Sequence, residues 1–402
     1  MTISTCFARC LLKGLPGLAA IAWMPLAGLP MSAQEPPATQ VSAAAQPLPA
    51  PSTTGPLRTA PPAAFNAGPL GTLDIAGVVC GLALAQRNDI SGDKSMHLDL
   101  SNGQVFIQKT DGWWQFYVQA GAYNIPALGT AYYATVDAVR GLYGPLPVGY
   151  LKLAPAQNFS ILAGFLPTLI GAESTFTFQN MNIERGLLWN QGNAVTRGVQ
   201  VNETVGKLGA STSWNDGFYS GRFSWLTGSL SYAFDGANTL AVKAGGNLGQ
   251  TAYRNLATPV QNNGGIYDIV YRHTKGSWIV QPYFQCTDIS TKPKAGVVKG
   301  AATRSGALLL TYKFQPHFSL SGRGEYISST GNAKEQAVNL LYGPGSGAWS
   351  LTLTPTIQDH GFFIRGEFSM VSATRYAAGA AFGPQGTARN QPRGAIEAGV
   401  MF

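Results

Sequence analysis

Strict alternation of apolar and polar side chains marks the chain around residues 158–221. Residues 159–165 alternate, a segment of about thirty residues follows, and alternation resumes at Val199. The next strand starts after only Gly206-Lys207 and runs to the turn signal Asn215-Asp216-Gly217. A period of two marks β-strands with unlike faces, so this stretch predicts strands joined by one long and one very short connection. If the asymmetry repeats, the chain is an up-and-down β-barrel.

The same rhythm continues over the rest of the chain from Leu73 onward. Tight turns and longer segments rich in Gly, Asn, Thr and Pro alternate between the strands. We expect about sixteen antiparallel strands, at 73–85, 104–109, 113–123, 148–153, 158–165, around 199–201, 208–215, 223–234, 240–248, 266–274, 278–289, 305–314, 318–328, 348–358, 362–371 and 395–402. An even number of strands places both termini on the same side of a membrane.

The distribution of charged residues between the two faces of each strand decides which face of the barrel wall meets lipid. Charged residues make up only 11% of the chain, against about a quarter in soluble domains. Ile364 and Phe368 share one face of their strand, while Arg365 and Glu367 share the other. About sixteen strands enclose a lumen too wide for side chains to fill, so the interior must be wet and the apolar face must meet lipid. We therefore expect an all-β transmembrane barrel of the outer-membrane kind, with short periplasmic turns and long extracellular loops.

The first 72 residues predict export followed by an unfolded leader. Arg9 and Lys13 precede an apolar stretch at 14–29, and a cleavage site near Met31-Ser32-Ala33 completes a signal peptide. The segment after it is rich in Pro and Ala and has few large apolar side chains, so it should be disordered in the periplasm. The expected order is a signal peptide at 1–33, a leader at 34–72 and an outer-membrane β-barrel at 73–402.

Four residues are exceptions or special cases in this assignment of faces. Asp74 and Glu203 fall in the lipid-facing phase near the periplasmic ends of their strands, where a charge costs only about 0–1 kcal/mol. Cys80 and Cys286 remain after signal removal and also fall in that phase, on strands far apart around the wall. We expect no disulfide between them, because bridged Cα atoms lie within about 7 Å.

Several motifs resemble those of one known family. They are Gly164-Phe165-Leu166-Pro167-Thr168 with Gly171-Ala172-Glu173, then Gln179-Asn180-Met181-Asn182-Ile183-Glu184-Arg185-Gly186-Leu187-Leu188-Trp189-Asn190, and Asn215-Asp216-Gly217-Phe218. The chain resembles the OmpL-like β-barrel porin-2 family of bacterial outer-membrane proteins over this stretch. Weaker matches follow at Arg323-Gly324-Glu325 and Arg365-Gly366-Glu367, and Phe402 resembles the terminal aromatic recognised during barrel assembly. The resemblance implies a passive or weakly selective channel and carries over no functional residue.

The first candidate site is the long connection from Leu166 to Thr196. Its large apolar side chains should pack against protein rather than water. One interpretation is a constriction loop folded into the lumen, where its charges set the pore width and local field. The alternative is a loop packed over the rim or at a subunit contact. The charged candidates in or beside this loop are Glu173, Glu184, Arg185 and Arg197.

The second candidate site is the set of charged side chains in the inward phase of the strands. Its members are Lys152, Lys243, Asp268, Arg272, Lys313, Arg323, Glu325, Arg365, Glu367 and Glu397. Bases outnumber acids, which predicts a mild preference for anions through the summed field. The alternative is that these charges neutralise one another within the wall, as Arg323 and Glu325 would if they paired on one face.

These observations predict a porin for passive diffusion of small hydrophilic solutes or ions, embedded in the lipid of the bacterial outer membrane. A structural or adhesion barrel with a plugged lumen is the alternative. An outer-membrane hydrolase is less consistent with the sequence, because none of its four histidines has a neighbouring nucleophile signature. We therefore expect no catalytic residue and no enzyme activity.

Composition restricts cofactors and partners further. No His/Cys cluster has metal-ligand spacing, so neither a metal nor a cofactor is expected. The net charge is +8, but it comes without a Lys/Arg run or a basic helical face, so we expect no nucleic-acid partner. The sequence allows both a monomer and a homo-oligomer, and it does not identify the solute.

Overall fold

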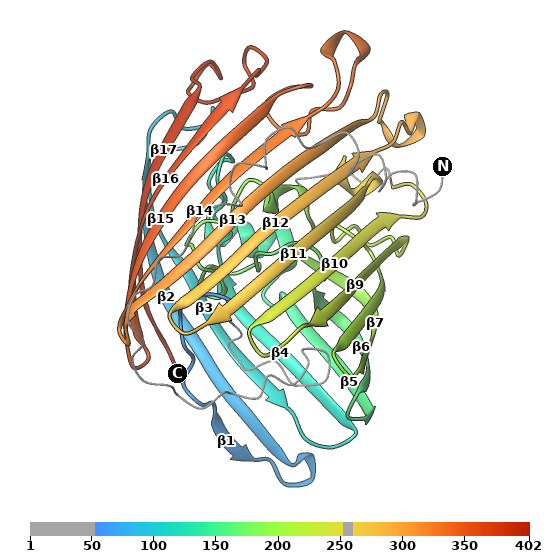
Figure 1. Cartoon of the computed structure of the whole chain (residues 1–402), viewed down its shortest axis with the longest axis vertical. Coiled ribbons are helices and arrows are strands. Elements are labelled where there is room, and N and C mark those ends of the chain that lie inside the picture. Colours follow the sequence, from blue (N-terminus) through green and yellow to red (C-terminus); the bar gives the residue numbers. More distant parts are fainter. Residues whose placement is uncertain (1–52, 252–259) are drawn as a thin grey trace.

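The computed structural model describes residues 53–251 and 260–402, and its main body is a closed antiparallel β-barrel (Figure 1). Each wall strand from β2 to β17 pairs with its neighbours in chain order, and β17 pairs with β2 to close the wall. These sixteen strands confirm the predicted all-β transmembrane barrel. A short additional strand, β1, pairs with the first residues of β2.

The bounds of the elements follow the chain. The strands are β1 (Ala63–Asn66), β2 (Thr72–Gln86), β3 (Met96–Lys109), β4 (Trp114–Tyr123), β5 (Val148–Ala156), β6 (Phe159–Pro167), β7 (Val195–Val205), β8 (Leu208–Asn215), β9 (Trp225–Ala233), β10 (Asn238–Asn247), β11 (Gly265–Lys275), β12 (Trp278–Ile289), β13 (Ala301–Gln315), β14 (Phe318–Ser329), β15 (Gly347–Asp359), β16 (Phe362–Thr374) and β17 (Asn390–Met401). The helical segments are η1 (Gly68–Leu70), α2 (Thr135–Ala138), η2 (Val139–Tyr143), η3 (Thr177–Gln179), η4 (Trp189–Gln191), η5 (Gln261–Asn263), η6 (Pro293–Ala295) and η7 (Ala333–Glu335). Within the described ranges no helix is both long and apolar enough to cross a membrane.

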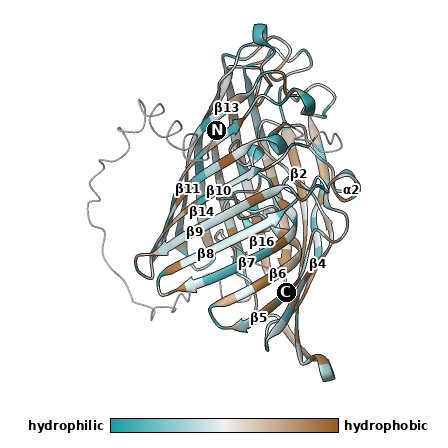
Figure 2. Cartoon of the chain, turned by 90° about the vertical axis from the view of Figure 1, so that its right-hand side faces the viewer, coloured by the Kyte–Doolittle hydropathy of each residue, from teal (hydrophilic) through white to brown (hydrophobic). Residues whose placement is uncertain are grey.

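The two faces of the wall follow the predicted phases. On β16, Ile364 and Phe368 are exposed on the outside, whereas Arg365 and Glu367 are buried on the inside. Figure 2 shows this alternation of hydrophobic and hydrophilic residues along the strands. The connections also alternate as expected, because two-residue turns such as 206–207 and 276–277 close one end while segments such as 168–194 close the other.

Several strand boundaries differ from the sequence prediction, and the largest shifts are at the starts of β3 and β17. β3 begins at Met96, eight residues before the expected start, because residues 96–102 continue the ladder with β2 across an irregularity beside Cys80 and Gly81. β17 begins at Asn390 rather than Ala395, so Arg393 belongs to the wall and not to a loop. In β3 the irregularity shifts the alternation by one residue, which hides the continuity of the strand from a pattern of period two.

The inner face of β2 is apolar, which reverses the predicted phase of two residues. Asp74 and Cys80 share their face with Ala76, Val78 and Leu82, and this face packs against protein inside the barrel. Cys80 is buried against Glu397, so its assignment to the lipid face was wrong. Glu203 is exposed on the outer face as expected, and neither Cys80 nor Cys286 forms a disulfide among the described residues.

Residues 53–72 have defined structure where the sequence predicted disorder. β1 pairs residues 63–66 with the first residues of β2, and Leu57 is buried against the inner wall. The disorder prediction considered only apolar surface, whereas a polar lumen also supplies hydrogen-bond partners to the backbone. The rest of the predicted leader, 34–52, and the predicted signal peptide, 1–33, lie outside the described residues.

Candidate functional site

The connection between β6 and β7, residues 168–194, folds into the barrel and packs against the inner wall. Phe178 meets Phe106 of β3 edge to face, with ring centroids 5.8 Å apart. Ile183 is buried against Leu82 and Leu84 of β2. These contacts lie on the inward side of the strands, so the geometry supports the constriction-loop interpretation rather than a loop over the rim. We call residues 168–194 the constriction loop.

Carboxylates of the wall accept hydrogen bonds from the backbone of this loop. Glu367 on β16 accepts from the N–H groups of Ile183 and Glu184, at 2.6 and 3.0 Å. Glu325 on β14 accepts from the N–H groups of Leu187 and Leu188, at 3.0 and 3.3 Å. Charge-assisted hydrogen bonds of this kind are about twice as strong as neutral ones, so the two carboxylates hold the loop by its main chain.

Arginines of the wall bind the carbonyl and carboxylate groups of the same loop. Arg323 on β14 donates to the carboxylate of Glu173 at 2.6 Å and to the carbonyl of Glu184 at 2.8 Å. Arg365 on β16 donates to the carbonyl of Asn180 at 3.1 Å and also pairs with Glu397 of β17. The wall therefore binds the loop through both the hydrogen-bond donors and the hydrogen-bond acceptors of the loop.

Arg393 on β17 joins the constriction loop to a second extracellular connection. Its guanidinium lies 2.7 Å from the carboxylate of Glu184 and donates to the carbonyl of Ala127 at 2.9 Å. A further bond reaches the carbonyl of Thr130. Ser369 donates to the other oxygen of Glu184 at 3.1 Å. Arg393 thus fixes the β4–β5 connection, residues 124–147, against the constriction loop.

Arg185 contributes charge to this cluster without a side-chain hydrogen bond among the described residues. Its guanidinium is fully buried, and none of its three nitrogens has a hydrogen-bond partner in the described part of the chain. It lies 5.5 Å from the ring centroid of Trp189. Burial lowers the pKa of Arg185 to about 10, against the opposing effect of Glu173, Glu397 and Glu184.

The cluster as a whole nearly balances its charge. Its glutamates are Glu173, Glu184, Glu325, Glu367 and Glu397, and its arginines are Arg185, Arg323, Arg365 and Arg393. Burial raises the pKa of Glu173 in the loop, and Glu325 adds to this rise while Arg323 opposes it. Buried charges of opposite sign at these distances hold structure together, and removal of one partner leaves the other uncompensated.

Eight predicted site residues therefore lie together, buried between the wall and the loop. They are Glu173, Glu184, Arg185, Arg323, Glu325, Arg365, Glu367 and Glu397. None of them lines either of the two cavities described below. The structure places these charges between the inner wall and the folded loop, and their role in setting the pore width and local field stays a prediction.

Arg197 lies on the opposite side of the wall from these anchors. It is directly opposite Phe165 in the ladder and shares the outer face of β7 with Val199. Its guanidinium pairs with Asp216 at 2.7 Å and stacks over Tyr219 with 4.0 Å to the ring centroid. The assignment of Arg197 to the pore is therefore wrong, since Arg197 belongs to β7 and has the same outward phase as Val199.

Lys243 and Asp268 secure the beginning of the constriction loop. They lie opposite each other on β10 and β11. Lys243 donates to the carbonyl of Gly171, and Asp268 accepts from the N–H of Gly171 at 2.8 Å. This pair was among the predicted inward charges, and its position confirms the phase of both strands.

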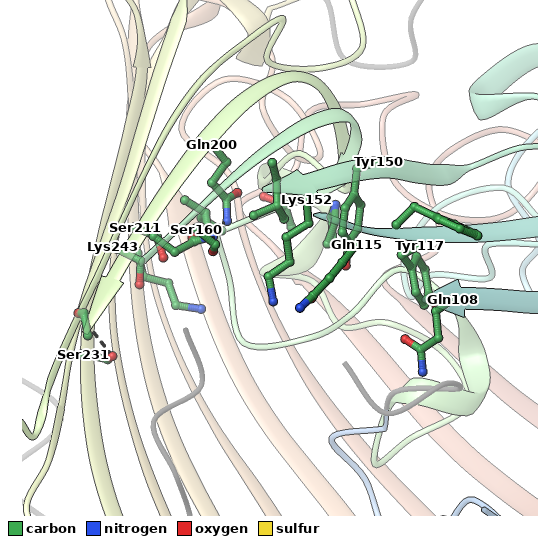
Figure 3. A pocket seen from close by; sticks show the side chains of 18 of the residues that line it. Gln108, Gln115, Tyr117, Tyr150, Lys152, Ser160, Gln200, Ser211, Ser231 and Lys243 are labelled. Atoms are coloured by element: carbon green, nitrogen blue, oxygen red, sulfur yellow. Dashed lines mark hydrogen bonds between the residues drawn. The ribbon is translucent and has the colours of Figure 1, made fainter. Parts of the chain in front are cut away.

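A polar cavity of about 360 Å³ lies on the inner side of strands β3 to β10 (Figure 3). Its lining carries three lysines, Lys109, Lys152 and Lys243, and no carboxylate among the described residues. Hydroxyl and amide groups supply the rest of its polar surface, from Ser160, Ser211, Ser229, Ser231, Gln108, Gln115, Gln200 and Asn202. Figure 3 shows Lys152 and Lys243 extending into this space from different strands.

Lys152 differs from the other two lysines in having no counterion. Lys109 pairs with Asp111 at 2.8 Å, and Lys243 faces Asp268. Within residues 53–251 and 260–402 the ammonium of Lys152 has neither an ion pair nor a hydrogen bond. The field in this cavity is therefore positive.

A second group of cations lies where the N-terminal segment enters the barrel. Arg272 donates to Gln281 at 2.8 Å and to the carbonyl of Thr54 at 2.9 Å. Arg58 and Lys313 lie within electrostatic range of this group. None of these three cations forms an ion pair with a carboxylate of the described chain. Arg272 and Lys313 are thus inward charges as predicted, and they add to the positive field.

The segment from Thr53 to Pro62, which we call the strap, runs inside the barrel and meets the constriction loop. Thr54 donates to the carbonyl of Gln179 from its N–H and from its hydroxyl, both at 2.7 Å. Gly55 lies against the backbone of Asn180 so closely that a Cβ there would be 2.4 Å from the carbonyl oxygen. Arg58 and Gln358 exchange hydrogen bonds at 2.8 and 2.7 Å nearer the periplasmic end.

Sequence reasoning missed Arg393 and the strap among the residues that shape the lumen. The alternation of Gln391, Arg393, Ala395 and Glu397 was the available signal for an inward Arg393. The strap gave no signal, because its contacts are mostly backbone hydrogen bonds. In the described part of the chain no group of three or more His, Cys, Asp or Glu residues forms a metal site.

Comparisons with known proteins agree with this geometry. The chain is similar in fold to OmpT, an outer membrane protein of Vibrio cholerae, with a TM-score of 0.55 at 11% identity over 83% of this chain and 99% of that one. It is also similar to OprB of Pseudomonas putida, with a TM-score of 0.52 at 10% identity over 82% and 94% of the two chains. No curated protein matches the chain. The model of the family described as "Putative beta-barrel porin-2, OmpL-like" matches residues 72–402, so the chain belongs to this family of outer-membrane barrels.

Proposed function

We propose that this porin-family barrel is a passive diffusion channel for small hydrophilic solutes with a preference for anions. The observation that carries the proposal is the unpaired ammonium of Lys152 in a lumenal cavity whose described lining has no carboxylate. The wall carboxylates Glu325, Glu367 and Asp268 accept hydrogen bonds from the constriction loop, and Glu397 pairs with Arg365. The charge left to act on a solute is therefore positive.

The strength of the anion preference depends on the distance between the lumenal cations and a passing ion, and on the salt concentration. The Debye length is about 8 Å at physiological ionic strength, so cations that line a narrow passage act on every ion that enters it. Lys152, Lys313 and Arg272 lie on three different strands around the inside of the wall. Rings of charge of one sign favour passage of the opposite sign, which supports selectivity for anions over cations.

The test is a reversal potential measured across a planar bilayer in a salt gradient. We expect the purified protein to favour chloride over potassium, and Lys152→Glu to lower or invert that preference. Lys294→Glu is the matched control, because Lys294 lies exposed in the extracellular segment between β12 and β13 and makes the same change of charge. Cation selectivity of the unaltered protein would contradict the proposal.

A plugged structural barrel is the second candidate, favoured by one observation. The constriction loop starts at β6 and contacts Arg323 on β14, and the strap lies inside the barrel against the same loop. A barrel closed by both segments would pass no current. Bilayer recording separates the two functions directly, since a diffusion channel conducts without any change to the chain.

Export and assembly belong to the same proposal. A signal peptide at 1–33 would deliver the chain to the outer membrane, where its exposed apolar band meets lipid. We propose a homo-oligomer in which part of this outer wall faces a second copy. Crosslinking in native membranes, followed by electrophoresis without heating, distinguishes the oligomer from a monomer.

A further inference from the structure

A second cavity of about 470 Å³ lies among the extracellular connections, on the side of the constriction loop that faces out of the cell. We call it the vestibule. It is lined by three connections that follow β4, β6 and β14, with single residues from the connections that follow β8 and β10. Ligand sites of small molecules commonly have volumes of about 300–1,000 Å³. The vestibule is therefore large enough for a molecule of one or two rings.

The lining of the vestibule carries no ionisable acid or base apart from tyrosine hydroxyls. Its rings are Tyr133, Tyr143, Trp189, Phe218 and Tyr342. Its amides are Asn190, Gln191, Asn193 and Gln261. This composition contrasts with the lysine-lined cavity on the other side of the loop. A charged molecule would lose hydration in the vestibule without gaining a counter-charge.

Gln191 shows what kind of group the vestibule lacks. Its side-chain amide donates to the carbonyl of Leu340 at 3.0 Å, which fixes its orientation. Its Oε1 is buried and has no hydrogen-bond partner within the described residues. A buried acceptor without a donor costs about 1–3 kcal/mol. A ligand that brings a hydroxyl donor to Oε1 would remove this cost, whereas a purely apolar ligand would not.

Aromatic faces and amide acceptors together select a molecule with an apolar face and donors at its edge. Trp189 is half-buried and Tyr133 is 39% exposed, so both rings are accessible from the extracellular side. The side-chain nitrogen of Asn190 donates to the carbonyl of Leu128 at 2.9 Å, so the side-chain oxygen is the group of this amide that can accept from a ligand. A neutral saccharide has C–H faces that pack on rings and hydroxyls that donate to amide oxygens. We propose that the vestibule binds a neutral saccharide of one or two rings.

This inference concerns binding at equilibrium and does not depend on conduction. Isothermal titration calorimetry of the purified barrel in a detergent without a sugar headgroup tests it, with maltose and sucrose as neutral probes and glucose 6-phosphate as the charged probe. We expect a neutral disaccharide to bind and the phosphate to bind at least about tenfold more weakly, from the cost of burying charge. Absence of binding by both disaccharides, or tighter binding of the phosphate, would overturn the proposal.

Variants separate the vestibule from general effects on folding. Tyr133→Ala removes an exposed ring. Gln191→Leu removes the unpaired acceptor at similar volume, together with the hydrogen bond to the carbonyl of Leu340. Each should raise the dissociation constant about fivefold or more, as expected for one lost contact. Trp113→Ala is the matched control, because Trp113 is an exposed ring at the periplasmic end, 66% accessible. Resistance to unfolding in SDS without heating confirms that each variant is folded, and an unchanged dissociation constant in both vestibule variants would contradict the assignment.

Discussion

The carboxylate of Glu367 lies 2.6 Å from the backbone nitrogen of Ile183, so a side chain of the barrel wall binds the main chain of the constriction loop. The same carboxylate accepts from Thr354 at 2.7 Å. Recognition of backbone groups fixes the path of the loop without requiring particular loop side chains at those positions. The charged side chains on the inner face of the wall therefore determine the path of the loop.

The first prediction concerns this contact. Glu367→Gln should loosen the constriction loop and lower the free energy of unfolding by about 2 kcal/mol, because hydrogen bonds to a charged group are worth about 1.5–3 kcal/mol. Urea titration followed by tryptophan fluorescence measures the change, and single-channel current noise should increase. Glu335→Gln is the control, since Glu335 is exposed and pairs only with exposed Lys299. Equal midpoints for the two variants would argue against the anchoring role.

The second prediction concerns the charge balance of the cluster. Arg393→Met should destabilise the barrel by about 3–5 kcal/mol, because it leaves Glu184 buried without its ion pair. The double variant Arg393→Met with Glu184→Gln should recover part of the loss, since it removes the uncompensated charge. Unfolding midpoints of both single variants and the double variant complete the cycle. Additive losses would show that the two residues act independently.

The wall of this barrel was predictable because every strand meets the same two environments. Lipid outside and polar groups inside impose a period of two, and burial on β16 follows it from Phe362 to Ser369, with Phe363 as an apolar side chain on the inner face. The prediction failed at residues 96–102, where an irregularity interrupts the alternation. It also failed on β2, where the constriction loop makes the inner face apolar.

The site was predictable in its members but not in their roles. The sequence identified Arg323, Glu325, Arg365 and Glu367 as inward charges, and the structure places all four inside. Whether an inward charge meets water or protein depends on where the constriction loop lies, and loop paths are not encoded in strand periodicity. The position of the strap was not predicted either, because Thr54 binds a backbone carbonyl of the loop and Gly55 packs closely against the loop backbone.

The third prediction tests whether the strap narrows the passage. Gly55→Val should expel the strap from the constriction loop, because the new Cβ would lie 2.4 Å from the backbone oxygen of Asn180. We expect a larger single-channel conductance and faster cleavage by trypsin after Arg58. Gly236→Val is the control, since a Cβ at Gly236 meets no atom within 4 Å. Unchanged conductance together with faster cleavage would show that the strap leaves without affecting the passage.

The fourth prediction concerns the pH dependence of residues 127–135, in the connection after β4. Asp93, between β2 and β3, accepts hydrogen bonds from the N–H of Tyr132 and from the side chain of Gln86, both at 2.8 Å. Burial acts to raise the pKa of Asp93, but these bonds, the bond from the N–H of Lys94 and the electrostatic attraction of His97 outweigh it, so the pKa lies below its ordinary value.

A carboxyl group with a lowered pKa in the folded protein stabilises the fold above its unfolded pKa, about 3.9, and loses this contribution as pH falls through the folded value. The contact between Asp93 and Tyr132 should therefore persist from pH 7 to 5 and weaken below about pH 4. Hydrogen exchange of a peptide covering residues 127–135, corrected for intrinsic rates, measures this opening. Asp93→Asn should exchange faster at pH 7 and lack the change below pH 4, whereas Asp235→Asn, at an exposed periplasmic turn, should leave the exchange of this peptide unchanged. Equal exchange in the unaltered protein and Asp93→Asn at pH 7 would show that the carboxylate does not hold residues 127–135 in place.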